Sequence, residues 1–102
     1  MMENNIILKE KKGFYEEIIY DYSKLEYKGE FKDDVFHGKG IYKEDKFEYE
    51  IVHYEGEFID GKFHGHGKWR KEVPDSNLVK TYEGEFEYGY QNGNGVDGEY
   101  RK

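Results

Sequence analysis

The middle of the chain alternates between ring-bearing and charged positions in a way that predicts a β-hairpin. Between Tyr54 and Phe58, two rings and a glycine alternate with two glutamates, which is the period of two expected of a strand with unlike faces. Asp60 and Gly61 then form a turn signal, because glycine accepts the positive φ of a tight hairpin. A second alternating run follows and ends at Trp69. Residues 54–69 are therefore predicted to fold as one hairpin.

The same pattern occurs three times along the chain. The copies begin at Tyr27, Tyr54 and Tyr82, with spacings of 27 and 28 residues, and a half-copy precedes the first. Self-similarity at such a period indicates a repeat array, in which each unit packs on its neighbours. We therefore expect one domain over residues 1–102, with a half-repeat at 5–24, repeats at about 25–46, 52–72 and 80–97, and a C-terminal cap at 98–102.

The two ends of the chain predict shorter elements. We expect an opening strand at Asn5–Glu10, a turn at Lys11–Gly13 and a second strand at Phe14–Tyr20, which is rich in β-branched and aromatic residues. The last strand is predicted to end near Asp97, where a polar tail fits a cap that discourages edge-to-edge growth. The apolar run Ile6–Leu8 makes the N-terminal strand the less protected end, so self-association through terminal strands is expected to start there.

The repeats resemble those of the MORN family (membrane occupation and recognition nexus). The matching pattern is Tyr-x-Gly-x-Phe, a turn and His-Gly-x-Gly, whole at Tyr54–Gly67 and nearly whole at Tyr27–Gly40. The resemblance implies an all-β fold: a single-layer antiparallel β-meander of stacked MORN-type hairpins that forms an open twisted trough. It also implies a non-catalytic scaffold or adaptor subunit of a larger assembly, in an intracellular setting that is cytoplasmic, cytoskeletal or axonemal.

The copies depart from the pattern at a few positions. Asp34 stands at the turn glycine of the first copy, and Asn92 replaces the histidine in the third. Gln91 and Asp97 also stand where the second copy has aromatic residues. The connectors at 43–53 and 70–81 are longer than is usual for the family, so the hairpin arms are expected to protrude there.

Glycines recur at one register, although glycine normally weakens the interior of a strand. We expect the bare backbone to let rings from neighbouring strands, such as Tyr27, Phe36 and Tyr42, lie flat across it. An alanine at Gly65 is therefore predicted to obstruct ring stacking. The glycines assigned this structural role are Gly29, Gly38, Gly40, Gly56, Gly65, Gly67, Gly84, Gly93 and Gly95.

The opposite side of the predicted sheet carries charge. First strands of the hairpins bring acidic residues and second strands bring basic ones, an arrangement that favours cross-strand pairs and a solvated, self-neutralising face. The residues concerned are Glu30, Glu55, Glu57, Glu83 and Glu85 on first strands, and His37, Lys39, His64, His66 and Lys68 on second strands.

The ring-bearing side is the candidate binding site. Aromatic residues make up 19% of the chain, and a one-layer sheet has no second layer to cover them. Exposed aromatic surface of this extent marks a protein interface, so we expect a partner helix or extended segment to bind there. A free sheet edge offers a second binding mode by strand addition. The residues predicted to contact the partner are Tyr27, Phe31, Phe36, Tyr42, Tyr54, Phe58, Phe63, Trp69, Tyr82 and Phe86.

The charge balance narrows the class of partner. The formal net charge is −7, which disfavours nucleic acid and anionic lipid because both require a basic field. Peripheral membrane or phosphoinositide binding remains the alternative function, with the best basic cluster at Lys68, Arg70 and Lys71 beside Glu72. The longest apolar run near the start is far short of a signal peptide or a membrane span, which also favours an intracellular protein.

Catalytic, metal and cofactor sites are not expected. There are no cysteines, which excludes disulfides and thiolate ligands. The stretch Gly93–Gly98 matches G-x-G-x-x-G without the helix that a dinucleotide site requires, so its glycines are interpreted as repeat glycines. His37 and His64 are expected to lie two strands apart, or about 10 Å, so two or three ligands could converge on a zinc ion but four are not expected to. We interpret these histidines as structural hydrogen-bonding residues and the chain as a non-enzyme.

Overall fold

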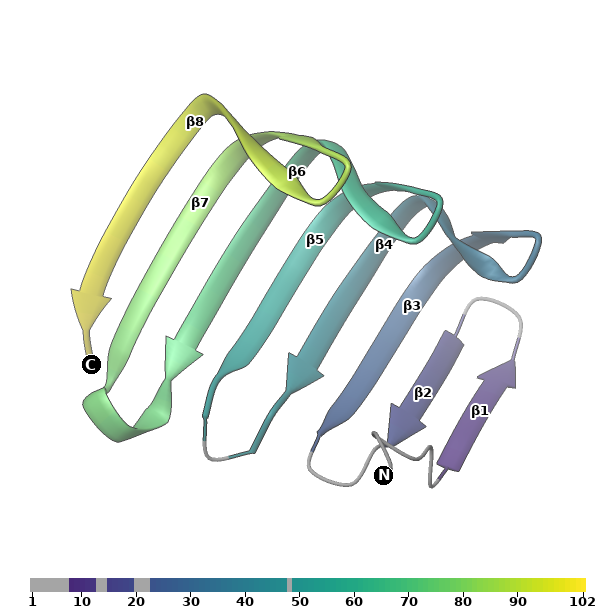
Figure 1. Cartoon of the computed structure of the whole chain (residues 1–102), viewed down its shortest axis with the longest axis horizontal. Coiled ribbons are helices and arrows are strands. Elements are labelled where there is room, and N and C mark those ends of the chain that lie inside the picture. Colours follow the sequence, from purple (N-terminus) through teal and green to yellow (C-terminus); the bar gives the residue numbers. More distant parts are fainter. Residues whose placement is uncertain (1–7, 13–14, 20–22, 48) are drawn as a thin grey trace, which may run out of the picture.

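The computed structural model describes residues 8–12, 15–19, 23–47 and 49–102, with side chains described from Ser23 onward. Eight strands form one antiparallel sheet in which each strand pairs with the next in the chain (Figure 1). This confirms the predicted all-β, single-layer meander. The strands are β1 (Leu8–Lys12), β2 (Tyr15–Ile19), β3 (Lys24–Lys32), β4 (Val35–Asp45), β5 (Ile51–Ile59), β6 (Lys62–Val73), β7 (Leu78–Glu87) and β8 (Tyr90–Arg101), and a short 3-10 helix η1 (Pro74–Ser76) joins β6 to β7.

The ends of the chain differ from the sequence prediction. Lys11 and Lys12 belong to β1 rather than to a turn, because they complete the ladder with β2 opposite Glu16 and Tyr15. Residues 5–7, 13–14 and 20 of the predicted first strands and turn lie outside the described residues. At the other end β8 continues past Asp97 to Arg101, since β7 starts early enough to pair with it throughout. Most of the expected cap at 98–102 is therefore strand.

The hairpin turns lie where the sequence predicts them. Asp60 and Gly61 have φ values of 49° and 82°, and Tyr88 and Gly89 have φ values of 45° and 96°. Two successive residues at positive φ are the mark of the type I′ turn, whose twist matches that of the flanking strands. Asp34 accepts a φ of 67° at the position where the later hairpins have glycine.

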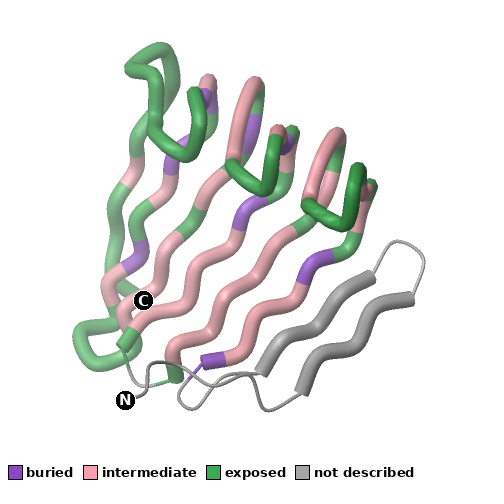
Figure 2. The backbone as a smooth tube through the Cα atoms, turned by 45° about the vertical axis from the view of Figure 1, so that its right-hand side comes forward, coloured by how far each residue is buried: buried purple, intermediate pink, exposed green. Residues whose placement is uncertain are grey.

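Each of these hairpins contains a β-bulge in its second strand. Gly29 pairs with Gly40 but Phe31 pairs with Phe36, so three residues of β4 lie opposite one residue of β3. The register shifts in the same way between β5 and β6 and between β7 and β8. Bulges bend and twist a strand, and the hairpin ends turn out of the plane of the sheet (Figures 1 and 2).

The core is a ladder of rings on one side of the sheet. Its buried members are spread over β3, β5 and β7, as Figure 2 shows for the described strands. Half-buried apolar residues from β3, β4 and β6 pack against them. We call this side the aromatic face, and the side with the alternating charges the charged face. The buried members of the ladder are Tyr27, Tyr54, Phe58, Tyr82 and Phe86.

Candidate functional site

On the aromatic face, the first tyrosine of each repeat lies across a glycine of the partner strand. A Cβ atom built on Gly67 would lie less than 3.0 Å from the ring and hydroxyl of Tyr54. The Tyr54 hydroxyl donates a hydrogen bond of 2.8 Å to the carbonyl oxygen of Glu57. Burial raises the pKa of Tyr54 to about 12. The same arrangement recurs at Tyr27 over Gly40, so the ring-over-glycine packing predicted from the sequence is a feature of the repeat.

The two glycines of each G-x-G have different roles, which corrects the expectation for Gly65. Gly65 lies in the bulge with a φ of 69°, and a Cβ atom there would meet the Glu57 side chain rather than a ring. Gly38 and Gly93 also have positive φ values, of 73° and 85°. The first glycine therefore permits the bulge, and the second, such as Gly67, makes room for the tyrosine.

The rings are linked within and between repeats. Tyr54 stacks on Phe63 with centroids 4.0 Å apart and planes inclined by 11°. Its edge contacts Phe58 of the same repeat and Phe86 of the next, each at 5.1 Å. Tyr27 repeats the pattern one hairpin earlier, stacked at 3.9 Å. Each ring cluster is thus completed by the following repeat.

The third repeat breaks this ladder. Tyr82 contacts Phe86 edge-on at 5.2 Å, but Gln91 occupies the position from which Phe63 stacks on Tyr54. Asp97 likewise lies opposite Tyr82 where Trp69 lies opposite Tyr54. With these two rings replaced by smaller side chains, the last hairpin leaves space on the aromatic face.

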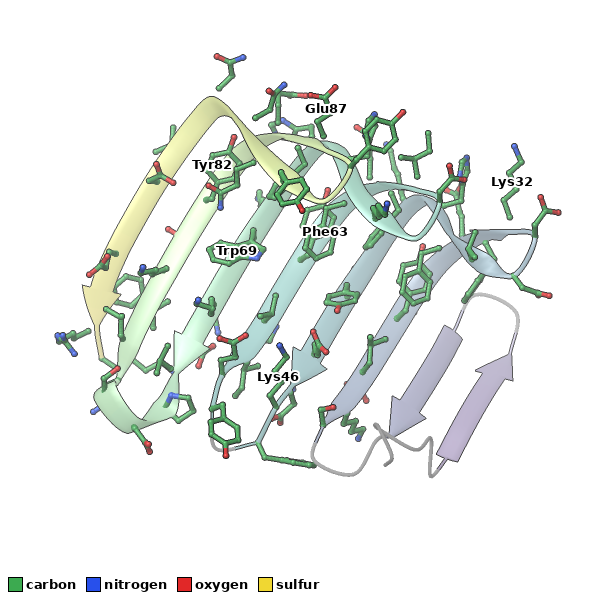
Figure 3. The ribbon with its side chains drawn as sticks, in the orientation of Figure 1. Lys32, Lys46, Phe63, Trp69, Tyr82 and Glu87 are labelled. Atoms are coloured by element: carbon green, nitrogen blue, oxygen red, sulfur yellow. The ribbon has the colours of Figure 1, made fainter. Side chains whose placement is uncertain are left out.

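A hollow of about 510 Å³ lies beside Trp69 at this point. It is lined by Lys71 and Lys80 on the inner strands and by Gln91, Asp97 and Glu99 on β8. Trp69 itself is half-buried and packs against the ring cluster, near Phe63 and Tyr82 (Figure 3). The hollow therefore combines one indole with a rim of both charge signs.

All ten residues predicted to contact a partner lie in this one cluster, but they are not equally accessible. Five of them are the buried members of the ladder, each at most 4% exposed. Other residues of the same chain cover them, so they have little surface left for a partner. The other five are half-buried and form the accessible part of the aromatic face: Phe31, Phe36, Tyr42, Phe63 and Trp69.

The charged face has the predicted alternation of acids and bases. Lys68 lies between Glu55 and Glu83 on the two neighbouring strands. His66 lies 3.3 Å from the carboxylate of Glu85 and 3.8 Å from that of Glu83. Cross-strand pairs between unlike residues therefore cover much of this face.

The sequence analysis missed two apolar side chains on the charged face. Ile41 is 52% exposed and Val96 is 75% exposed, and the register places both in the row of Lys68. Open hollows of about 600 Å³ and 530 Å³ adjoin this row. Strand alternation could have indicated the position of Ile41: it immediately precedes Tyr42 of the aromatic face, so its side chain lies on the charged face.

His64, the signature histidine of the second repeat, connects that repeat to the third. The backbone N–H of Tyr88, in the turn of the third hairpin, donates to Nδ1 of His64 at 3.2 Å, and the two rings lie 4.7 Å apart. The N–H of Gly89 donates to the carbonyl of Phe63 at 2.8 Å. These contacts give His64 the structural role predicted for it and attach the third turn to the preceding hairpin. His37, for which the same role was predicted, does not repeat the bond: its Nδ1 is buried without a hydrogen-bond partner among the described residues.

The basic cluster considered for lipid binding is divided between the two faces. Strand alternation puts Lys68 and Arg70 on the charged face and Lys71 on the aromatic face. Arg70 donates to the carboxylate of Glu72, and Lys71 lies 3.7 Å from that of Glu50. The three cations therefore do not form a single basic patch.

Glu72 anchors the C-terminal residue. Its carboxylate accepts hydrogen bonds from Lys102, at 2.8 Å, and from Arg70, and these bonds lower the pKa of Glu72 to about 2. The Lys102 N–H also donates to the carbonyl of Asn77 at 2.9 Å. These contacts hold the end of β8 against the connection between β6 and β7.

Among the described residues, no group of three His, Asp or Glu side chains is placed to hold a metal ion. Within the same ranges, no helix has the length and apolar character needed to cross a bilayer.

Comparison with known families bears on the repeats directly. The family described as MORN repeat matches residues 27–43, 54–71 and 82–96, the three hairpins whose side chains form the ring ladder. Comparison with curated proteins finds no sequence that matches this one. MORN repeats form a non-catalytic family whose members take part in protein–protein or membrane interactions. Three matches in order, each coinciding with one hairpin, show that this chain belongs to the MORN-repeat proteins.

Proposed function

We propose that the protein is a non-catalytic scaffold or adaptor that binds a protein segment on the aromatic face. The observation that carries the proposal is the half-buried Trp69 beside the hollow of about 510 Å³. Hollows of roughly 300–1,000 Å³ suit an inserted side chain or small group, and tryptophan is among the residues most often found at the centre of protein interfaces.

The rest of the aromatic face extends this contact along the sheet. Tyr42 lies two strands from Trp69 in the same row, and Phe63 is half-buried on the same side. A segment crossing β4 to β8 over these rings would reach Lys71 and Lys80 on one side of the hollow and Asp97 on the other. The proposed partner is therefore a helix or extended segment that combines apolar residues with charge of both signs.

Membrane binding is the weaker alternative. The formal net charge is −7, and the cations of the best basic cluster lie on opposite faces beside carboxylates. An anionic bilayer attracts cations gathered on one surface. The setting that accords with the proposal is an intracellular assembly, cytoplasmic or cytoskeletal, with no cofactor.

Photocrosslinking from neighbouring positions tests which face binds. A benzophenone amino acid at Tyr42 reports on the aromatic face, and the same residue at Ile41 reports on the charged face one position away. In native extract, we expect a discrete protein adduct from position 42 that is lost in Trp69→Ala, and none from position 41. An adduct from position 41 alone would transfer the binding site to the charged face.

A parallel flotation experiment tests the alternative. Vesicles of phosphatidylcholine, with and without phosphatidylserine and a phosphoinositide, are mixed with the purified protein. We expect no flotation with either composition. Flotation that needs anionic lipid and is abolished by Arg70→Glu would replace the scaffold proposal by membrane binding.

A further inference from the structure

Among the described residues, the two outer strands of the sheet are β1 and β8, and they run in opposite directions. Each neighbouring pair in the order β1 to β8 is antiparallel, so odd-numbered strands share one direction and even-numbered strands the other. A strand that continued the array beyond β8 would therefore run in the direction of β1. A second copy of the chain carries such a strand at its own outer edge (Figure 1).

The outer part of β8 is suited to accept a strand. Within the described residues, β8 has a neighbour only on the β7 side. Its bulge is near Gly93, and the segment from Val96 to Tyr100 pairs with β7 without any further register shift. Val96 is 75% exposed and Tyr100 is 51% exposed. Unpaired N–H and C=O groups on such an edge form a template for another strand.

The register of the sheet specifies which residues would meet. Following the paired positions from strand to strand, Lys11 of β1 lies in the same row as Asp97 of β8. By the same route Lys9 lies in the row of Glu99, and Leu8 lies in the row of Tyr100. Rows run straight across a sheet, so β1 of a second copy, added in phase, would bring each of these pairs face to face.

In this register, charged residues face each other at two positions, and the two residues of each pair have opposite charges. Lysine opposite aspartate and lysine opposite glutamate are favourable cross-strand pairs, and the leucine lies opposite the exposed Tyr100. A slip of two residues in one direction would instead place Lys9 opposite Arg101, which is a repulsive pair.

We propose that the protein self-associates head to tail, with β1 of one copy adding to β8 of the next through the pairs Lys11–Asp97 and Lys9–Glu99. The contact joins two different edges, so it is heterologous and is repeated by every added copy. The product is a continuous sheet in which the hairpins of successive copies follow one another in phase. The junction shares Asp97 and Glu99 with the hollow beside Trp69, so a change on β8 bears on both proposals, whereas a change on β1 bears on self-association alone.

Two charge-reversal variants test the junction. Lys9→Glu/Lys11→Glu alters only the β1 side, and Asp97→Lys/Glu99→Lys alters only the β8 side. Sedimentation velocity of the wild type over a concentration series is expected to show a growing series of oligomers. Each variant is expected to weaken the association by about tenfold or more, because two attractive pairs become repulsive. Lys32→Glu/Lys62→Glu, at exposed hairpin ends, makes the same charge change as the β1 variant and is expected to associate like the wild type.

An equimolar mixture of the two variants provides the sharper test. The β8 variant still has a native β1 edge, and the β1 variant still has a native β8 edge. Mixed together they are expected to regain association and to grow as alternating copies. The native edges pair as in the wild type, and the two altered edges carry glutamates on one variant and lysines on the other, which also attract. Circular dichroism melts of each variant check that the fold is intact.

Three results would overturn the proposal. The wild type could remain monomeric at all concentrations up to about 1 mM, which would exclude even a weak association. Both variants could associate as the wild type does. The β1 variant could still dimerise while the β8 variant does not, which would indicate symmetric pairing of two β8 strands.

Discussion

Tyr54 lies across Gly67 so closely that a Cβ atom at Gly67 would fall less than 3.0 Å from the tyrosine ring. Gly67→Ala must therefore displace the ring or separate β5 from β6, and overpacking of this kind costs about 1–3 kcal/mol. We expect a clear fall in the thermal and urea midpoints. Gly98→Ala is the matched control, because a Cβ atom there closely approaches only the Thr81 hydroxyl, which can rotate away. Equal losses in the two variants would contradict the ring-over-glycine account.

The hydroxyl of Tyr54 is expected to contribute separately from its ring. Tyr54→Phe removes the hydrogen bond to the Glu57 carbonyl and should cost about 0.5–1.5 kcal/mol at neutral pH. Burial raises the pKa of Tyr54 from 10.0 to about 12, so the folded state holds this proton more tightly than the unfolded chain. The resulting stability is complete below pH 10 and is lost as the pH rises towards 12. Urea melts across this range should show a steeper loss for the wild type than for Tyr54→Phe.

The contact between His64 and the next turn predicts a local effect on exchange. His64→Ala removes the acceptor for the Tyr88 N–H and the ring against Tyr88, so the turn of the third hairpin should open more often. Hydrogen exchange of the Tyr88 and Gly89 amides should accelerate, while amides in the centre of β5 change little. His66→Ala, which removes only exposed ion pairs, is the control. Unchanged exchange at Tyr88 would show that the histidine does not hold the turn.

Glu72 is expected to make stability sensitive to acid. Its pKa is lowered from 4.5 to about 2, first by the hydrogen bonds from Lys102 and Arg70. The stabilisation is therefore present above pH 4.5 and disappears as the pH falls towards 2. Lys102→Ala should cost about 1 kcal/mol at pH 7, since the lysine is half exposed and the pair is screened. The difference between variant and wild type should shrink in melts at pH 3 and below; a constant difference would exclude the linkage.

Restoring the missing ring of the third repeat links stability to binding. Gln91→Phe should stack on Tyr82 as Phe63 stacks on Tyr54, which is worth about 0.5–1.5 kcal/mol beyond buried area. The thermal midpoint should therefore rise. Because Gln91 lines the hollow beside Trp69, the same change should reduce the crosslink from position 42. A stabilised variant that retains the full crosslink would place the partner elsewhere.

The sequence predicted the hairpins well because their signals are local. The turn at Asp60 and Gly61, the ring alternation around Tyr54 and the repeat spacing each depend on neighbouring residues or on a simple period. The ring ladder followed from these features, since residues that share a face at a constant register must meet. The family pattern agreed with the same positions.

Features that depend on bulges were not predicted. Gly65 and Gly67 look alike in the sequence, yet one has a φ of 69° and the other supports a ring, because only the observed register shows where the bulge falls. The bulges also turn the hairpin ends, and the rings carried there take part in burying half of the predicted contact residues. The strand character of Lys11 and of the residues after Asp97 depended on partners across the sheet rather than on local pattern.

The attachment of each turn to the previous hairpin, through Gly61 to Phe36 and Gly89 to Phe63, makes every unit a neighbour only of the adjacent ones. Gain or loss of one unit during evolution would therefore leave the other internal contacts intact. Each unit adds two strands, or about 10 Å of width. The width of the sheet is therefore set in fixed steps by the number of units.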